Sequence, residues 1–465
     1  MKKKNILIYC YMLKRLEDLI LFSKYISNEF NIIFIIYDKS YIPLLELNDI
    51  DYIYGYSYYS SNNIQKKIIT KIIKNRLIQK QLISMRKYSI GQYINELIFL
   101  YQCDYYTKIA KSVIKDNNID MFITITDRHL GDKESGLFKA CYDLNIPIFL
   151  PFMIAWNPQS NYLMIKDSSK YTLTNQSSTY QKKVFEKHSY QAYKNHYFYQ
   201  AYKFKVLEKL GILSKMPWVS GGGIVDVNSV PNKRSYKQHI DMGIDKKKLK
   251  ILGDISYIPL YNCYKNKEEE KIKIIKKYNL KHNKIFIISL ANWWEHNLAD
   301  KQTHWDIIHN TIKSTLYCAN EYSVLVCLHP SMKLEYYEFL ELKYDIKILE
   351  ERLMQVLPVA DIYIVDQSST VPWAIICGIK VLIICYYKNL NLFSDFNSIV
   401  YAKKDNEIRE KLKHLISKEV SFAHDWDLLS RDTIFNDKVT KKNIDVLNKL
   451  INKNEKIDEN TFNLL

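Results

Sequence analysis

Ser323-Val324-Leu325-Val326-Cys327-Leu328-His329-Pro330 decides the fold of this chain, because it is a buried apolar strand that ends in an imidazole and a proline. A second apolar strand at residues 361–365 ends in Asp366-Gln367-Ser368-Ser369-Thr370, and a third at residues 380–384 follows Gly378. Helical segments separate these strands, and this alternation is typical of a doubly wound parallel sheet. Such sheets bind ligands beyond the carboxyl ends of their strands. The imidazole and the hydroxyl cluster therefore form a candidate phosphate site at a predicted helix start.

The N-terminal half repeats this architecture. Apolar strands are expected at residues 5–9, 31–37, 119–124 and 146–150, with helices at about 12–28 and 133–144 and largely helical stretches at 63–116 and 171–210. The strand at 119–124 is followed by Thr126-Asp127-Arg128-His129, again a polar strand end that leads into a helix. No GxGxxG follows the first strand, so the sequence does not predict a dinucleotide cofactor. The pattern predicts an α/β protein with two Rossmann-like domains.

Glycines mark the expected domain boundary. Six of the eleven glycines fall between Gly211 and Gly253, and they include the run Gly221-Gly222-Gly223, which permits positive φ and close backbone approach. An interdomain turn and a loop packed against substrate both explain this run. We expect an N-terminal domain with helical insertions at residues 1–250 and a C-terminal domain at 251–435. Residues 436–465 are expected to form a helix and tail that cross back to the N-terminal domain.

Composition excludes several classes of function. The formal net charge of +17 comes from lysines spread along the chain, which are most often a solvated face but would also attract an anionic membrane. No Cys/His zinc spacing and no glycine-aromatic RNA-binding signature is present, so nucleic acid is not an expected partner. Eight cysteines without a CxxC pair indicate a reducing compartment. With no signal-peptide pattern, we expect a cytoplasmic protein, in peripheral contact with the inner face of the membrane.

Three motifs resemble the GT-B glycosyltransferase superfamily. They are Gly253-Asp254-Ile255-Ser256-Tyr257, Leu328-His329-Pro330, and the Ser-Ser-Thr run at 368–370 followed by Gly378-Ile379-Lys380-Val381. The closer resemblance is to bacterial surface-carbohydrate proteins related to CDP-glycerol glycerophosphotransferases, capsule Kdo and sialic acid transferases, and UDP-GlcNAc 2-epimerases. The N-terminal half is similar in architecture only. The resemblance implies two domains facing across a cleft and a transferase that moves a sugar, or a polyol phosphate, from a nucleotide-activated donor to a glycan or lipid-linked acceptor.

Two positions depart from the superfamily pattern. Trp373 stands where many GT-B enzymes place a glutamate that holds the donor ribose, and Lys380 replaces the proline of Gly-x-Pro-Val. The missing glutamate favours a CMP or CDP donor over a UDP donor. It also keeps open a non-catalytic GT-B-like binding or scaffold protein of polysaccharide assembly. A UDP-GlcNAc 2-epimerase-like enzyme, which needs no acceptor, is the alternative within enzymes.

The expected donor contacts surround the ends of the C-terminal strands. They are His329, Pro330, Gln367, Ser368, Ser369, Thr370, Asn292, Trp293, Glu295 and His296. Each has a structural alternative, since serine and threonine cap helices in any protein and tryptophan pairs more often pack in cores. No Asp-x-Asp motif accompanies Asp366, so no metal is expected, and the nucleotide sugar is a substrate rather than a resident cofactor.

The acceptor hydroxyl needs a general base. A carboxylate or imidazole at a strand end lies within reach of such a hydroxyl, which makes Asp127 the first candidate and His129 the second. Asp132 and Glu134 are further carboxylates in the same region. The structural alternative for Asp127 is a helix cap or a pair with Arg128.

Overall fold

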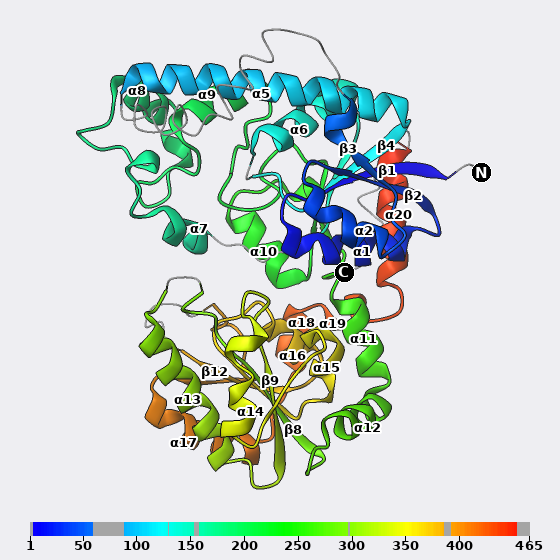
Figure 1. The fold of residues 1–465 in the computed structure, drawn as a ribbon, viewed down its shortest axis with the longest axis vertical. Coiled ribbons are helices and arrows are strands. Elements are labelled where there is room, and N and C mark those ends of the chain that lie inside the picture. Colours follow the sequence, from blue (N-terminus) through cyan, green and yellow to red (C-terminus); the bar gives the residue numbers. More distant parts are fainter. Residues whose placement is uncertain are drawn as a thin grey trace. The chain divides into compact units, whose positions relative to one another are not determined.

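The computed structural model describes residues 3–58, 88–128, 130–152, 158–295, 298–385 and 392–452. The chain forms two compact units (Figure 1). Unit 1 comprises Met1–Val230, Ser235–Leu252 and Thr440–Leu465, and unit 2 comprises Pro231–Arg234 and Gly253–Val439. The sequence analysis predicts a domain boundary after residue 250 and a return of residues 436–465 to the N-terminal domain.

Unit 1 is built on a seven-stranded sheet with the order β3-β2-β1-β4-β5-β6-β7. The strands are β1 Lys4–Tyr9, β2 Phe30–Ile36, β3 Tyr52–Tyr54, β4 Ile119–Thr124, β5 Ile148–Leu150, β6 Val227–Val230 and β7 Leu249–Ile251. Every pairing is parallel, and β1 pairs with both β2 and β4. The strand order therefore reverses between β1 and β4, which is where open α/β sheets bind ligands.

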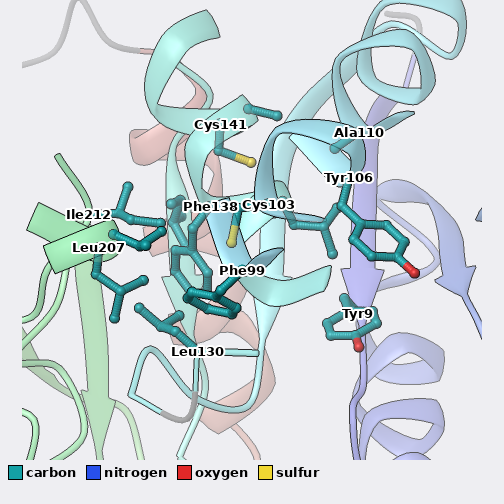
Figure 2. Close-up of a cluster of buried hydrophobic side chains, with 14 of the residues drawn as sticks. Tyr9, Phe99, Cys103, Tyr106, Ala110, Leu130, Phe138, Cys141, Leu207 and Ile212 are labelled. Carbon is teal, nitrogen blue, oxygen red and sulfur yellow. The ribbon is translucent and has the colours of Figure 1, made fainter. Parts of the chain in front are cut away.

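Helices cover both faces of this sheet. They are α1 Leu16–Ile26, α2 Ile42–Glu46, α5 Ser89–Asp116, α6 Asp132–Leu144, α7 Pro158–Ile165, α8 Thr179–Lys187, α9 Ala201–Lys209, α10 Lys233–Asp241 and α20 Val439–Ile451. Figure 2 shows part of the core between the sheet and α5 and α6. These two helices cross closely at Gly136, where a Cβ atom would lie 2.5 Å from Cβ of Tyr106. On the other face, Phe22 of α1 stacks on Phe149 with 6.2 Å between ring centroids.

The predicted helical stretches hold only in part. Of residues 63–116, the part before residue 88 lies outside the described residues, and the rest forms α5. Residues 171–210 form the two short helices α8 and α9, separated by turns, instead of a continuous helix. Among the described residues, no helix combines the length and the apolar character that crossing a membrane requires.

Unit 2 is built on a six-stranded sheet with the order β10-β9-β8-β11-β12-β13, in which every pairing is parallel. Its strands are β8 Lys284–Ser289, β9 Tyr322–Cys327, β10 Lys347–Ile348, β11 Ile362–Val365, β12 Lys380–Ile384 and β13 Ile399–Ala402. Its helices are α11 Tyr257–Lys265, α12 Lys267–Tyr278, α13 Lys301–Tyr317, α14 Phe339–Lys343, α15 Leu353–Val356, α16 Val371–Ile376, α17 Ile408–Ser417, α18 Ala423–Leu428 and α19 Arg431–Ile434. The strand order reverses between β8 and β11, so the predicted polar strand ends surround the second switch point.

Candidate functional site

A chain of hydroxyl groups joins the carboxyl ends of β8 and β11. Tyr363 of β11 is fully buried, and its hydroxyl donates to Oγ of Ser289, the last residue of β8, at 2.8 Å. The same hydroxyl lies 2.6 Å from Oγ1 of Thr370, which lies 2.9 Å from Oγ of Ser368. Tyr363 is in register with Ile287, so alternation along the strand places its side chain and that of Ser289 on the same face of the sheet. The predicted hydroxyl cluster is therefore anchored to the sheet.

His329 follows β9 beside this hydroxyl chain in the strand order, and its neighbours fix its proton. The backbone N–H of Ser331 donates to Nδ1 of His329 at 3.1 Å, and Nδ2 of Asn292 lies 3.0 Å from the same nitrogen. Both groups are donors, so Nδ1 is an acceptor and the proton of the neutral ring is on Nε2. The side chain of His329 is exposed. The structure thus brings together Asn292 and His329, and it places an exposed imidazole with its proton on Nε2 after β9.

Trp293 and Asp366 meet at the switch point of unit 2. Trp293 is buried after β8 and donates a hydrogen bond to Asp366, the first residue after β11. Oδ1 of Asp366 is buried without a hydrogen-bond partner among the described residues. Burial raises the pKa of this carboxyl to about 6. Asp366 can therefore hold a proton under mildly acidic conditions.

Asp366 makes the stability of unit 2 depend on pH. Because its folded-state pKa of about 6 lies above the ordinary value, its contribution is fully present below about pH 4 and is lost as the pH rises past about 6. The neutral variant Asp366→Asn is expected to raise the free energy of unfolding by up to about 2 kcal/mol above neutral pH, with no gain near pH 4. Thermal unfolding across this range measures it, with the exposed Asp432→Asn as control. A pH-independent difference would contradict the assigned pKa.

Two of the predicted donor residues, Glu295 and Gln367, are engaged in hydrogen bonds within unit 2. Glu295 accepts a hydrogen bond from the buried Tyr337, whose hydroxyl lies 2.9 Å from Nε2 of His304 in α13, so this carboxylate anchors its loop to the core. Gln367 lies 2.9 Å from Sγ of Cys385 through Nε2 and ties the segment after β11 to the end of β12. His296 lies outside the described residues. Contact of Glu295 or Gln367 with a donor stays a prediction, and both side chains are already engaged.

In unit 1, Asp127 and the glycine run come together. The backbone N–H of Gly221 donates to Oδ1 of Asp127 at 3.0 Å, and that of Gly223 donates to Oδ2 at 2.6 Å. Asp127 is 1% exposed, and burial raises its pKa, against the lowering effect of the two glycine N–H groups. Gly222 fits closely as well, because a Cβ atom there would lie 2.1 Å from the carbonyl oxygen of Met216. The carboxylate holds the loop, and because both of its oxygens are engaged by the loop N–H groups, a structural role is favoured over a general base or a substrate loop.

Arg128 is the charged neighbour of Asp127 in the sequence. Its side chain is fully buried, and Nη1 donates to the carbonyl oxygen of Trp218 at 3.1 Å. Burial lowers the pKa of the guanidinium, and the charge of Asp127 opposes that effect. The predicted alternative of an Asp127–Arg128 interaction therefore has a physical basis. His129 lies outside the described residues.

Glu134 is the carboxylate that faces the switch point of unit 1. It lies in the first turn of α6, is largely buried, and accepts a hydrogen bond at 3.4 Å from the hydroxyl of Tyr9, the last residue of β1. Burial raises its pKa above the ordinary value. The ring of Tyr37, after β2, lies 6.0 Å from that of Tyr9, and Nζ of Lys133 lies 5.5 Å from the Tyr37 ring. These residues line the carboxyl ends of β1, β2 and β4.

Two residues of the candidate site in unit 2 were not predicted from the sequence. Ser331 joins Asn292 and His329, with its Oγ 2.9 Å from Nδ2 of Asn292. Tyr363 was read only as part of an apolar strand, although a buried tyrosine hydroxyl needs a partner and so signals a polar site nearby. Ser369, which lies between Ser368 and Thr370 in the sequence, and Pro330, which follows His329, are both exposed. In the part of the chain that the structure describes, no group of three or more His, Cys, Asp or Glu side chains is arranged to hold a metal ion.

Comparison with known proteins identifies the fold. No family model and no curated protein matches the sequence. A solved glycosyltransferase from Rickettsia africae ESF-5 matches with a TM-score of 0.50 and 15% identity, covering 98% of this chain and 100% of that chain. The glycotransferase of kitacinnamycin matches with a TM-score of 0.53 and 10% identity (97% and 100% covered), and the UDP-GlcNAc 2-epimerase of Neisseria meningitidis, bound to UDP-GlcNAc, with 0.50 and 10% (96% and 100% covered). The chain has the GT-B fold. The predicted fold of two Rossmann-like domains is confirmed.

One departure from the GT-B motif has a local explanation. Lys380, in place of the expected proline, extends Nζ to the carbonyl oxygens of Leu415 and Ile416 at 3.1 and 3.2 Å. These carbonyls end α17, where a cation is favourable beside the negative end of the helix dipole. The replacement therefore stabilises the packing of α17 against β12. Trp373, at the position where many GT-B enzymes have a glutamate for the donor ribose, is half-buried in α16.

Proposed function

We propose that this GT-B protein is a glycosyltransferase that moves a sugar, or a polyol phosphate, from a nucleotide-activated donor to a surface polysaccharide or glycolipid precursor. The observation that supports this most is the placement of the exposed His329, protonated on Nε2, next to the hydroxyl chain in the strand order at the switch point of unit 2. A fold alone does not assign an activity, since the same fold carries transferases and epimerases. The proposal therefore depends on the chemistry of the site.

Sugar transfer breaks the bond between the anomeric carbon and the donor phosphate, whereas transfer of a polyol phosphate breaks the bond between the two donor phosphates. In both cases negative charge develops on the phosphate of the leaving nucleotide. Preorganised N–H and O–H donors stabilise such charge without reorganisation. His329 meets this requirement because Asn292 and Ser331 hold its ring with the proton on Nε2. Ser368 and Thr370 are positioned by the buried hydroxyl of Tyr363. We propose a CMP or CDP donor, with UDP as the alternative, and no resident cofactor or metal.

The acceptor hydroxyl must lose a proton, and we propose Glu134 as its base in place of Asp127. Both oxygens of Asp127 already accept N–H groups of the glycine run. Glu134 instead lies at the carboxyl ends of the unit 1 strands, and its raised pKa makes it a stronger base near neutral pH. Transfer also requires the donor and the acceptor to be bound at the same time.

Nucleotide binding tests the donor half of this proposal. A nucleotide that binds only the folded protein raises the melting temperature by mass action. We expect one of CMP, CDP, UDP, GDP and ADP to produce a clear shift that EDTA leaves unchanged. His329→Ala is expected to abolish the shift, whereas the exposed histidine variant His414→Ala, on α17, keeps it. No shift with any nucleotide would favour the non-catalytic scaffold, and an undiminished shift in His329→Ala would remove that residue from the site.

Turnover separates the two enzymatic readings. The sugar nucleotide whose base gives the shift is incubated with the protein, with and without lipid-extracted surface glycan, and the products are separated by mass. Release of nucleotide with gain of sugar mass on the glycan supports transfer. Consumption of UDP-GlcNAc without any acceptor, with release of UDP or an isomerised donor, would instead establish the epimerase-like alternative.

A further inference from the structure

The first turns of α5 carry an apolar stripe on their outer face. Ile90, Tyr93 and Leu97 are 62%, 53% and 66% exposed, and their spacing of three and four residues places them on one side of the helix. The stripe ends before Asp104 and Lys108, which form an exposed ion pair at 2.7 Å. Large apolar side chains grouped in this way are unusual on a surface that meets only water.

The stripe is not a misplaced part of the core. The opposite face of α5 supplies Phe99, Cys103 and Tyr106 to the large core cluster of unit 1, where Figure 2 shows them between α5 and its neighbours. The helix is therefore firmly held, and its rotation is fixed by this packing. The outer stripe is presented by a rigid element and does not depend on a local rearrangement.

A basic surface borders the stripe. The helices α8 and α9 lie beside α5 (Figure 1), and Tyr180 of α8 packs its ring edge-on against Tyr93 with 4.7 Å between centroids. Nζ of Lys205 in α9 lies 5.7 Å from the Tyr180 ring. The exposed charged residues of the two helices are four lysines and two glutamates: Lys183, Lys187, Lys205, Lys209, Glu186 and Glu208. One of these glutamates, Glu208, is paired with Lys187 at 2.7 Å.

The sequence that leads into α5 is also basic. Residues 59–87 contain eight lysines and arginines and no aspartate or glutamate. This stretch ends immediately before Tyr88, two residues from the start of the stripe. An apolar stripe bordered by cations is the pattern of surfaces that lie in the interface of anionic membranes, where buried apolar area and attraction to lipid headgroups add. A protein partner of neutral surface would not need this charge.

We propose that the α5 stripe, Ile90, Tyr93 and Leu97, docks unit 1 on an anionic lipid surface, with the lysines of α8 and α9 against the headgroups. This inference deepens the proposed function, because a lipid-linked acceptor is presented at such a surface. It names the face that makes the contact. It requires no turnover, so it stands or falls separately from the nucleotide-binding experiment.

Vesicle co-sedimentation of the full chain tests the docking face. We expect binding to equimolar phosphatidylglycerol and phosphatidylcholine, little binding to phosphatidylcholine alone, and a loss of affinity as salt is raised. The double variant Ile90→Gln/Leu97→Gln is expected to weaken binding by about tenfold or more, and Lys205→Gln/Lys209→Gln by a smaller factor. The control Ile272→Gln/Leu342→Gln removes two comparably exposed apolar side chains from unit 2 and should bind like the wild type.

Three outcomes would overturn the proposal. The first is that the wild type does not bind anionic vesicles. The second is that the stripe variant binds as tightly as the wild type. The third is that the unit 2 control loses as much vesicle affinity as the stripe variant. Melting temperatures of all variants verify that they are folded. Light scattering measures the oligomeric state of the same variants. If the wild type were a dimer and the stripe variant a monomer, this face would bind a second copy of the chain instead of a membrane.

Discussion

Asp127→Ala is expected to lower the melting temperature by roughly 6 to 20 °C, since uncoupling a buried ionic arrangement costs about 3 to 5 kcal/mol and each kcal/mol corresponds to about 2 to 4 °C in a unit of this size. The variant leaves the backbone N–H groups of Gly221 and Gly223 without their acceptor. It also removes a negative charge beside the fully buried Arg128. Burial lowers the pKa of that guanidinium, and the charge of Asp127 opposes this effect. The loss comes from groups left without compensation in a dry interior.

The matched control for this change is Asp104→Ala. Asp104 is an exposed carboxylate of the same unit, paired only with Lys108 on its own helix, so its removal should cost less than about 0.5 kcal/mol. Differential scanning fluorimetry and near-ultraviolet circular dichroism compare the two variants. If Asp127→Ala melted like the wild type and lost only transfer activity, Asp127 would be the base that the sequence suggested, and Glu134 would not be needed in that role.

The architecture was predictable because its signal is local. A parallel strand buried on both faces is a short, nearly continuous apolar run, and the predicted runs at residues 119–124 and 380–384 are β4 and β12. The short strands β3 and β10 were missed, since Tyr52–Tyr54 and Lys347–Ile348 are too brief for a periodic pattern. Their pairing depends on neighbours that are distant in the sequence, which a local reading does not include.

The site was predictable by position more than by role. His-Pro and Ser-Ser-Thr follow β9 and β11, as predicted, because a polar residue after an apolar strand is visible in the sequence. The partners of those residues were not visible: the hydroxyl of Tyr363 and the Asp127–glycine contact join segments that are far apart in the sequence. Asp127 is the instructive case, since a carboxylate at a strand end fits both a base and an anchor. Only the two N–H groups that engage both of its oxygens favour the anchor.

Gly222→Ala is the second change for which we expect a large effect. The new Cβ atom would lie 2.1 Å from the carbonyl oxygen of Met216, and a backbone atom cannot move aside as a flexible side chain would. Overpacking of this kind costs about 1 to 3 kcal/mol or more. The shift would also carry the N–H groups of Gly221 and Gly223 away from Asp127, so we expect a loss of at least about 3 kcal/mol and a melting temperature lower by roughly 6 °C or more.

Gly243→Ala is the matched control, because the same methionine lies next to both glycines. A Cβ atom at Gly243 would lie 4.0 Å from Cε of Met216, which is ordinary contact, and the cost is limited to the left-handed φ of +85°. That strain amounts to about 1 to 2 kcal/mol. The difference between the two variants therefore isolates the close fit of the glycine run from the general cost of replacing glycine. Equal melting temperatures would mean that the run relaxes easily, and a loop that relaxes easily is free to take the predicted role of packing against substrate.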